Sequence, residues 1–206
     1  MRSVPRWALI SSGAAPVILV GGWTAAGALE GPAYDPVTQT ISVLAAYGAA
    51  GFWVMTSALF GLGVCHLLTA WGLRAARLAG RLALAGGGAV ALVVALVPPP
   101  LSGGSLRHGS AAAVGFALLA VWPVLAAAGS GSAPWALRPV PAVAVTTVMA
   151  VGAGWYLLET ARHGAAGVAE RFVTCLQSVW PLVVVASCLL YRRRDEPPTA
   201  GPTGSS

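Results

Sequence analysis

Six long apolar runs that contain no charged residue constrain the fold of this chain more than any other feature. They cover residues 7–29, 47–73, 82–97, 109–129, 139–158 and 172–191. A transmembrane helix needs about 20 predominantly apolar residues. Helices satisfy all of their own backbone hydrogen bonds in lipid. The sequence therefore predicts an all-α, polytopic transmembrane bundle of six spans within residues 1–191, followed by a disordered Pro/Gly/Ser-rich tail at 192–206.

The composition excludes an ordinary soluble domain. Charged residues make up 9% of the chain and hydrophobic ones 57%, whereas soluble domains carry about 25% charged residues. The expected partner is the lipid bilayer. Nucleic acid is not an expected partner despite the net charge of +6, because the arginines flank apolar runs. The 26 glycines and the absence of lysine are typical of a G+C-rich bacterial genome. The expected location of a multi-pass protein of such a genome is the plasma (inner) membrane.

The arginine distribution predicts the orientation. Nine arginines fall on the side of the two termini, and three (Arg107, Arg162 and Arg171) fall on the other side. Because cytoplasmic loops are enriched in basic residues, both termini are predicted to be cytoplasmic. Small residues are dense within the spans, as in GLG at 61–63 and AGGGA at 85–89. Such residues favour close contact between helix backbones.

Ionisable residues gather in the three predicted outer loops, 30–46, 98–108 and 159–171. Acid–base chemistry needs carboxyl or imidazole groups held at a helix end or in a buried site. The candidate catalytic residues are Asp35, His108, Glu159 and Glu170. The candidate ligand-binding residues are Arg107, Arg171, Ser42, His163 and Trp155. Simple solvent exposure of polar loops explains the same pattern without any site.

Local spacing gives three further expectations. Asp35–Pro36 should form a turn, since proline biases the preceding residue away from helix. Thr38, Thr40 or Ser42 should cap the second span. Glu159 and His163 are four residues apart and would share a face if the helix continued through them.

Three short motifs resemble those of a known family. They are YDPVTQTISVLAA before the second span, RHG opening the fourth and GVAERF opening the sixth. On a six-span chain of this length they resemble the domain of unknown function 998 family of prokaryotic membrane proteins. The resemblance implies a fold and a membrane location, with no assigned activity. In that family an acidic residue typically follows the Ile-Ser pair, whereas here Val43 follows Ser42.

Four functions fit these residues. The first is a non-enzymatic protein whose outer polar cluster binds a lipid headgroup or small hydrophobic ligand. The second is an intramembrane acid–base enzyme on a lipid or isoprenoid, similar to a terpene cyclase, with Glu159 and Glu170 as the acids and Trp155 beside the substrate. A metal hydrolase using His108, His163 and the outer acids, and a transporter, rank lower. No cofactor and no bound metal are predicted, and the sequence leaves open whether the protein is an enzyme.

Overall fold

The computed structural model describes residues 4–102, 104–129 and 133–195, and in this part of the chain helices are joined by turns and loops, with no strand. The six long helices are α1 (Trp7–Glu30), α3 (Phe52–Gly72), α4 (Leu78–Leu96), α5 (Leu106–Ala126), α6 (Pro139–Arg162) and α7 (Ala166–Asp195). Short helices η1 (Gly31–Ala33), α2 (Ile41–Leu44) and η2 (Trp135–Leu137) lie in the connections. All six long helices are long and apolar enough to cross a membrane. The predicted all-α, six-span fold class is confirmed.

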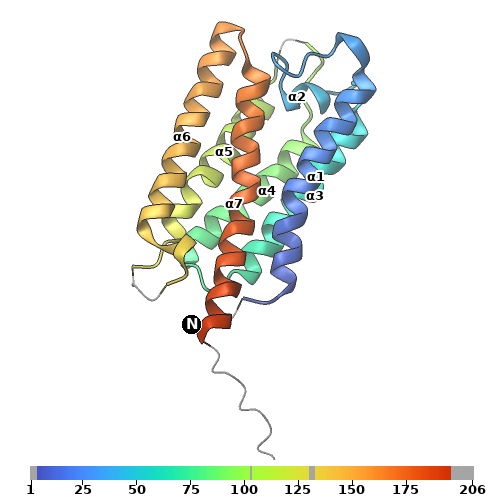
Figure 1. The fold of residues 1–206 in the computed structure, drawn as a ribbon. Helices are drawn as coiled ribbons and strands as arrows, with labels where there is room; N and C mark the ends of the chain where they lie inside the picture. The colour runs from blue at the N-terminus through green and yellow to red at the C-terminus, as the bar shows by residue number, and fades with distance from the viewer. Residues whose placement is uncertain (1–3, 103, 130–132, 196–206) are drawn as a thin grey trace, which may run out of the picture.

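The long helices form a closed ring in chain order. Each packs against its neighbours in sequence, α1 with α3, α3 with α4, α4 with α5, α5 with α6 and α6 with α7, and α7 returns to α1. The first turn of α1 and the last turns of α7 lie at the same end (Figure 1). At the opposite end lie residues 31–51, 97–102 and 163–165, which we call the cap. The α5–α6 contact is less extensive than the α4–α5 contact.

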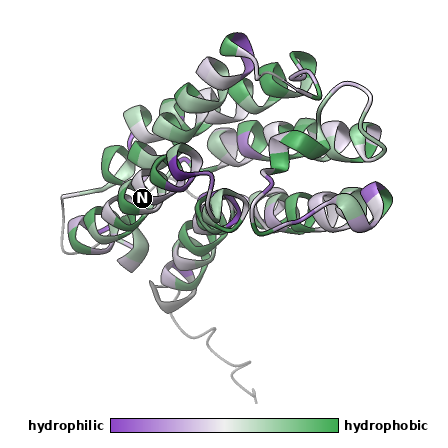
Figure 2. Cartoon of the chain, turned by 90° about the horizontal axis from the view of Figure 1, so that it is seen from above, coloured by the Kyte–Doolittle hydropathy of each residue, from purple (hydrophilic) through white to green (hydrophobic). Residues whose placement is uncertain are grey.

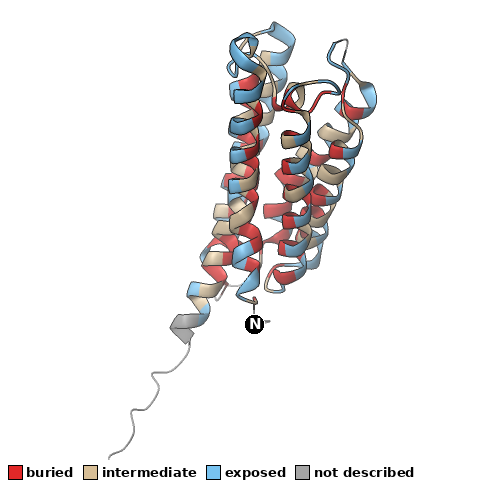
Figure 3. Cartoon of the chain, turned by 90° about the vertical axis from the view of Figure 1, so that its right-hand side faces the viewer, coloured by how far each residue is buried: buried red, intermediate tan, exposed pale blue. Residues whose placement is uncertain are grey.

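The distribution of side chains around the ring is that of a membrane protein. Apolar residues run along the helices (Figure 2). Buried residues occupy their inward sides and exposed ones their outward sides (Figure 3). Large apolar side chains are also exposed on the outward sides, including Ile10, Trp53 and Val140. Exposed apolar patches of this extent are rare on soluble monomers, so the outward surface suits lipid.

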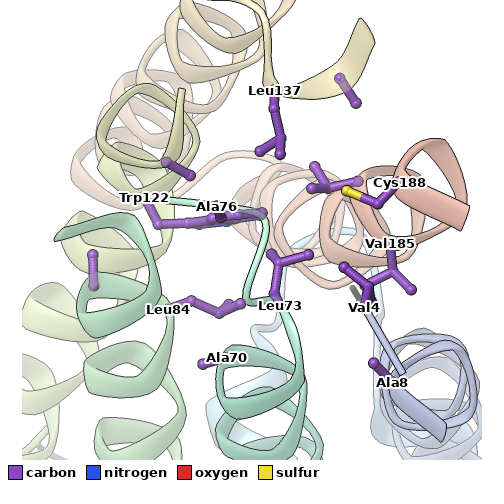
Figure 4. Close-up of a cluster of buried hydrophobic side chains, with 14 of the residues drawn as sticks. Val4, Ala8, Ala70, Leu73, Ala76, Leu84, Trp122, Leu137, Val185 and Cys188 are labelled. Carbon is purple, nitrogen blue, oxygen red and sulfur yellow. The ribbon is translucent and has the colours of Figure 1, made fainter. Parts of the chain in front are cut away.

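The largest buried cluster closes the ring at the end opposite the cap. Trp122 of α5 is fully buried there among Leu73, Leu84, Leu137 and Val185, which come from four other parts of the chain (Figure 4). This cluster joins the first and the last long helix, α1 and α7.

Helices α3 and α4 approach each other through paired glycines, as the small-residue runs predicted. A Cβ atom on Gly63 would lie 2.7 Å from the carbonyl oxygen of Gly88, and one on Gly88 would lie 2.8 Å from the carbonyl oxygen of Gly63. Real Cβ atoms do not approach backbone so closely, so only glycine fits at both positions without moving the helices apart.

The second span begins later than the sequence predicted. It starts at Phe52 rather than near Tyr47, because residues 41–51 form α2 and a further loop. The expectation that Thr38, Thr40 or Ser42 caps this span is wrong, since Gly51 occupies its N-cap position. Thr38 instead donates to Asp35, and Thr40 precedes α2 without a side-chain cap hydrogen bond. At the other terminus α7 continues to Asp195, and the rest of the predicted tail lies outside the described residues.

We expect Gly63→Ala to lower the midpoint of thermal unfolding in detergent, because overpacking of a tight contact costs about 1–3 kcal/mol. Gly21→Ala is the matched control, since a Cβ on Gly21 meets nothing within 4 Å. The alanine there should be neutral or slightly stabilising, by up to about 1 kcal/mol. Equal midpoints for the two variants would contradict the close glycine contact.

Candidate functional site

Arg171, near the start of α7, holds the loop that follows α1. Its Nη1 donates to the carbonyl oxygens of Pro36 at 2.9 Å, Gln39 at 3.1 Å and Gly167 at 2.9 Å. Its Nη2 donates to the hydroxyl of Tyr34. The guanidinium also lies over the ring of Trp23, 5.8 Å from its centroid. This predicted ligand-binding residue is thus engaged with the protein itself.

Asp35 organises the same loop from within. Its Oδ1 accepts from the backbone of Val37 at 2.9 Å and its Oδ2 from the hydroxyl of Thr38 at 2.8 Å. This arrangement confirms the predicted turn at Asp35–Pro36. The hydrogen bond from the Val37 amide, with that from Thr38, lowers the pKa of the exposed Asp35 carboxyl. Burial raises the pKa of neighbouring Tyr34, against the opposing effect of Arg171.

Glu170 is the most deeply buried acid among the described residues, with 4% of its surface exposed. Its Oε2 accepts the backbone N–H of Ile41, the first residue of α2. Within the described part of the chain its other oxygen has no hydrogen-bond partner, and the side chain faces two cavities. A buried carboxylate with a free oxygen is a group that a ligand or water can meet.

His108 and Ser42 form a hydrogen-bonded pair beside it. His108 Nδ1 lies 2.9 Å from the carbonyl oxygen of Val97, and Nε2 lies 3.1 Å from Ser42 Oγ. A carbonyl oxygen can only accept, so Nδ1 of the neutral imidazole must carry the proton. Nε2 then offers a lone pair, and the Ser42 hydroxyl donates to it.

Ser42, His108 and Glu170 share one cavity, which we call the cleft. It lies between α5 and α6 under the cap and has a volume of about 900 Å³. Thr40, Ser105 and Tyr156, which carry hydroxyl groups, also line it. Farther along, its walls are small apolar residues of α5 and α6: Ala112, Ala113, Ala117, Ala120, Ala150, Ala153 and Gly154.

The cleft opens towards the membrane-facing surface. Ala113, Ala117, Ala150 and Leu157 line it and are themselves exposed on the outward sides of α5 and α6. A separate cavity of about 90 Å³ lies inside the ring, where it also touches Ser42 and Glu170. Ser42 and Glu170 therefore lie between the cleft and the smaller cavity inside the bundle.

The remaining sequence-predicted residues lie outside the cleft. Glu159 accepts the backbone N–H of Ala165 at 2.7 Å and so braces the α6–α7 turn. His163 is exposed, and its left-handed conformation (φ 55°) ends α6. The expectation that it shares a helix face with Glu159 is therefore wrong. Arg107 is exposed on α5, and Trp155 packs against Phe172 with ring centroids 6.1 Å apart. Six of the sequence-predicted residues are not among the described residues that line the cleft: Asp35, Glu159, Arg107, Arg171, His163 and Trp155.

A metal centre would need three suitable side chains in one place. Within residues 4–102, 104–129 and 133–195, no three His, Cys, Asp or Glu side chains come close enough to bind one ion. His108 is buried under the cap, whereas His163 is exposed at the α6–α7 turn. The predicted ligands thus do not assemble into a metal site.

Several residues of the site were not found from the sequence. The Val97 carbonyl, which fixes the His108 tautomer, carries no sequence signal. The small residues of the α5 and α6 walls do carry one, since Gly109, Ala113 and Ala117 recur every four residues and so lie on one helix face.

Comparison with known proteins gives one match. The family model described as "Protein of unknown function (DUF998)" matches residues 13–187. The chain belongs to the DUF998 family. No curated protein and no solved structure matches it. The three motifs that resembled this family contribute Ser42, His108 and Glu170, the residues that meet at the polar end of the cleft in this DUF998 protein.

Replacing Arg171 with Gln should loosen the loop at 34–40. The carbonyl oxygens of exposed Pro36 and half-buried Gln39 then lose a charged donor, and a hydrogen bond to a charged group contributes at most about 1.5–3 kcal/mol. We expect faster hydrogen–deuterium exchange at residues 37–41 and a lower unfolding temperature. Arg107→Gln is the control, because Arg107 is exposed and makes no hydrogen bond with the described residues. Wild-type exchange in Arg171→Gln would contradict the anchoring role.

The Asp35 turn should weaken in acid. The folded-state pKa lies below the usual 3.8. The stabilisation from the carboxylate is therefore complete above the unfolded-state pKa and is lost as pH falls through the folded-state value. We expect wild type to unfold at a higher temperature than Asp35→Asn at pH 7, and the gap to shrink towards pH 3. A gap that is independent of pH would contradict this role.

Proposed function

We propose that this protein binds an amphiphile from the surrounding membrane, with the polar end of the ligand at Ser42, His108 and Glu170 and its apolar chain along the α5–α6 cleft. The observation that carries the proposal is the composition of the cleft, which has hydrogen-bonding groups at one end and small apolar residues along the rest. Ligand sites typically have volumes of roughly 300–1,000 Å³, and the cleft's 900 Å³ falls within that range.

The charges around the cleft favour an uncharged head group. Among the described residues, no arginine lines the cleft, and Glu170 is its single ionisable acid. An anionic phosphate would meet no arginine there and would lie close to the buried acidic side chain of Glu170. A lipid that carries both a hydroxyl and an ester, in contrast, can donate through its hydroxyl to Glu170 and accept through its ester oxygens from Thr40, Ser105 or Tyr156. We therefore propose a neutral lipid such as an acylglycerol.

The arrangement offers less support to the isoprenoid-cyclase hypothesis. That hypothesis pairs Glu159 with Glu170 among aromatic side chains. Glu159 braces the α6–α7 turn instead, and Trp155 packs on Phe172. Tyr156 and Phe116 are the aromatic residues of the described chain that line the cleft, which is a sparse wall for shielding a carbocation.

The arginine distribution supports placing the cap on the outer side of a bacterial plasma membrane, with both termini in the cytoplasm. In that orientation the polar end of the cleft would face the outer leaflet. The proposed ligand would then be a lipid of that leaflet.

Filling the apolar part of the cleft should block binding. We expect Ala117→Trp and Ala150→Trp to abolish binding of 1-oleoylglycerol to the detergent-solubilised protein, as measured by native mass spectrometry. Both alanines are exposed, so the indole would occupy the cleft without displacing the core. The mass of the bound species would give the stoichiometry.

Ala144→Trp is the matched control. Ala144 is also exposed on α6 but does not line the cleft, so its variant should bind like wild type. Phosphatidylglycerol should bind more weakly than 1-oleoylglycerol. Equal binding by all three tryptophan variants, or no binding of 1-oleoylglycerol by wild type, would reject the proposal.

A further inference from the structure

We infer that Ser42 is a nucleophile and His108 its general base, so that the protein cleaves an acyl ester held in the cleft. This inference rests on the proposed function, since the cleft must bring the ester to Ser42. It goes beyond it by assigning a reaction and naming the atom that attacks.

The first argument is the proton arrangement. A serine hydroxyl becomes a useful nucleophile when an adjacent base can take its proton, and that base must be held in the right tautomer by a third group. Ser42 Oγ lies 3.1 Å from His108 Nε2, and Val97 O lies 2.9 Å from Nδ1. The backbone carbonyl thus does for His108 what a carboxylate does in a catalytic triad.

The second argument is access. Ser42 Oγ has no hydrogen-bond partner other than His108 within the described residues. Both residues line the 900 Å³ cleft, where Ser42 is half-buried and His108 is buried with 5% of its surface exposed. A pair with a purely structural role would not need to face so large a space.

The third argument is the rigidity of the pair. The backbone N–H of His108 donates to Ser105 Oγ at 3.3 Å at the start of α5. On the other side, Glu170 holds the N–H of Ile41, the residue before Ser42. The Tyr47 N–H donates to Pro99 O at 2.9 Å, which ties the chain after α2 to the segment carrying Val97. Serine, imidazole and carbonyl are therefore each fixed by a neighbouring contact.

The reaction balances with water as the co-reactant. Ser42 Oγ attacks the ester carbonyl carbon while its proton passes to His108 Nε2. The tetrahedral intermediate expels the alcohol, which takes that proton. Water then attacks the acyl-Ser42 ester, gives a proton to His108, and releases the fatty acid as the proton returns to Ser42. Thr40 and Tyr156, which also line the cleft, carry hydroxyl groups of the kind that can donate to the developing oxyanion.

The carbonyl of Val97 carries no full negative charge, so it orients the imidazole but stabilises the imidazolium less than a carboxylate would. We therefore expect slow turnover, and a covalent label is the sharper readout. Fluorophosphonate reagents react by displacement of fluoride from phosphorus by an activated serine oxygen.

The test is to incubate the purified full-length protein in detergent with an alkyl fluorophosphonate and to map the adduct by peptide mass spectrometry. We expect the adduct on Ser42. Ser42→Ala should lose it, and His108→Gln should slow labelling by about 10²-fold or more, the usual contribution of a general base. Ser102→Ala, which removes an exposed serine at the same cleft, should label like wild type.

Thermal unfolding of each variant in the same detergent shows whether the fold is retained. The wild-type experiment does not depend on the variants, because an adduct elsewhere, or none, overturns the inference by itself. Oleate release from 1-oleoylglycerol, lost in Ser42→Ala, would support ester cleavage. Wild-type protein that binds 1-oleoylglycerol but forms neither adduct nor oleate would overturn the nucleophile and leave the proposed binding intact. Absence of 1-oleoylglycerol binding would instead reject the proposed function.

Discussion

The cap depends on two adjacent side chains at the start of α7. A non-helical segment beside a membrane must find partners for its backbone groups, because lipid offers none. In the chain between α1 and α3, the carbonyl oxygens of Pro36 and Gln39 accept hydrogen bonds from Arg171. The backbone N–H of Ile41 donates a hydrogen bond to Glu170. The Arg171 guanidinium thus satisfies carbonyl acceptors, and the neighbouring Glu170 carboxyl satisfies an N–H donor, of the same segment. This contact sets the position of Ser42.

The sequence was sufficient for the bundle and insufficient for the cap. Apolar runs with charged ends predict spans because the bilayer imposes the length of each helix. Nothing comparable acts on residues 31–51, where α2 appears and the start of α3 shifts to Phe52. The Glu159–His163 pairing failed for a related reason: α6 ends at Arg162, and His163 turns left-handed. His108, Glu170 and Ser42 were recognised as candidates, but their meeting point depends on loop contacts that no periodicity encodes.

Small residues show most clearly what the spacing of residues in the sequence does not determine. At Gly63 and Gly88 they bring two backbones into contact, which is the usual meaning of such a pattern in membrane helices. On α5 and α6 the same residue types, such as Ala117 and Ala150, line an opening instead. Spacing alone cannot separate the two outcomes. What differs is the extent of contact between the two helices: α3 and α4 pack closely together, whereas α5 and α6 contact each other less extensively.

The depth of the cleft connects its chemistry to the membrane. Along α5 its lining runs from His108 to Ala120, a distance of about 18 Å at 1.5 Å per residue. Half of the hydrocarbon core measures about 15 Å. The polar end lies under the cap, where the head groups of one leaflet would be, and the apolar walls continue towards the middle of the bundle. A lipid could therefore enter sideways between α5 and α6 without turning over. Its ester, which lies at the boundary between head group and chain, would then arrive at the level of Ser42.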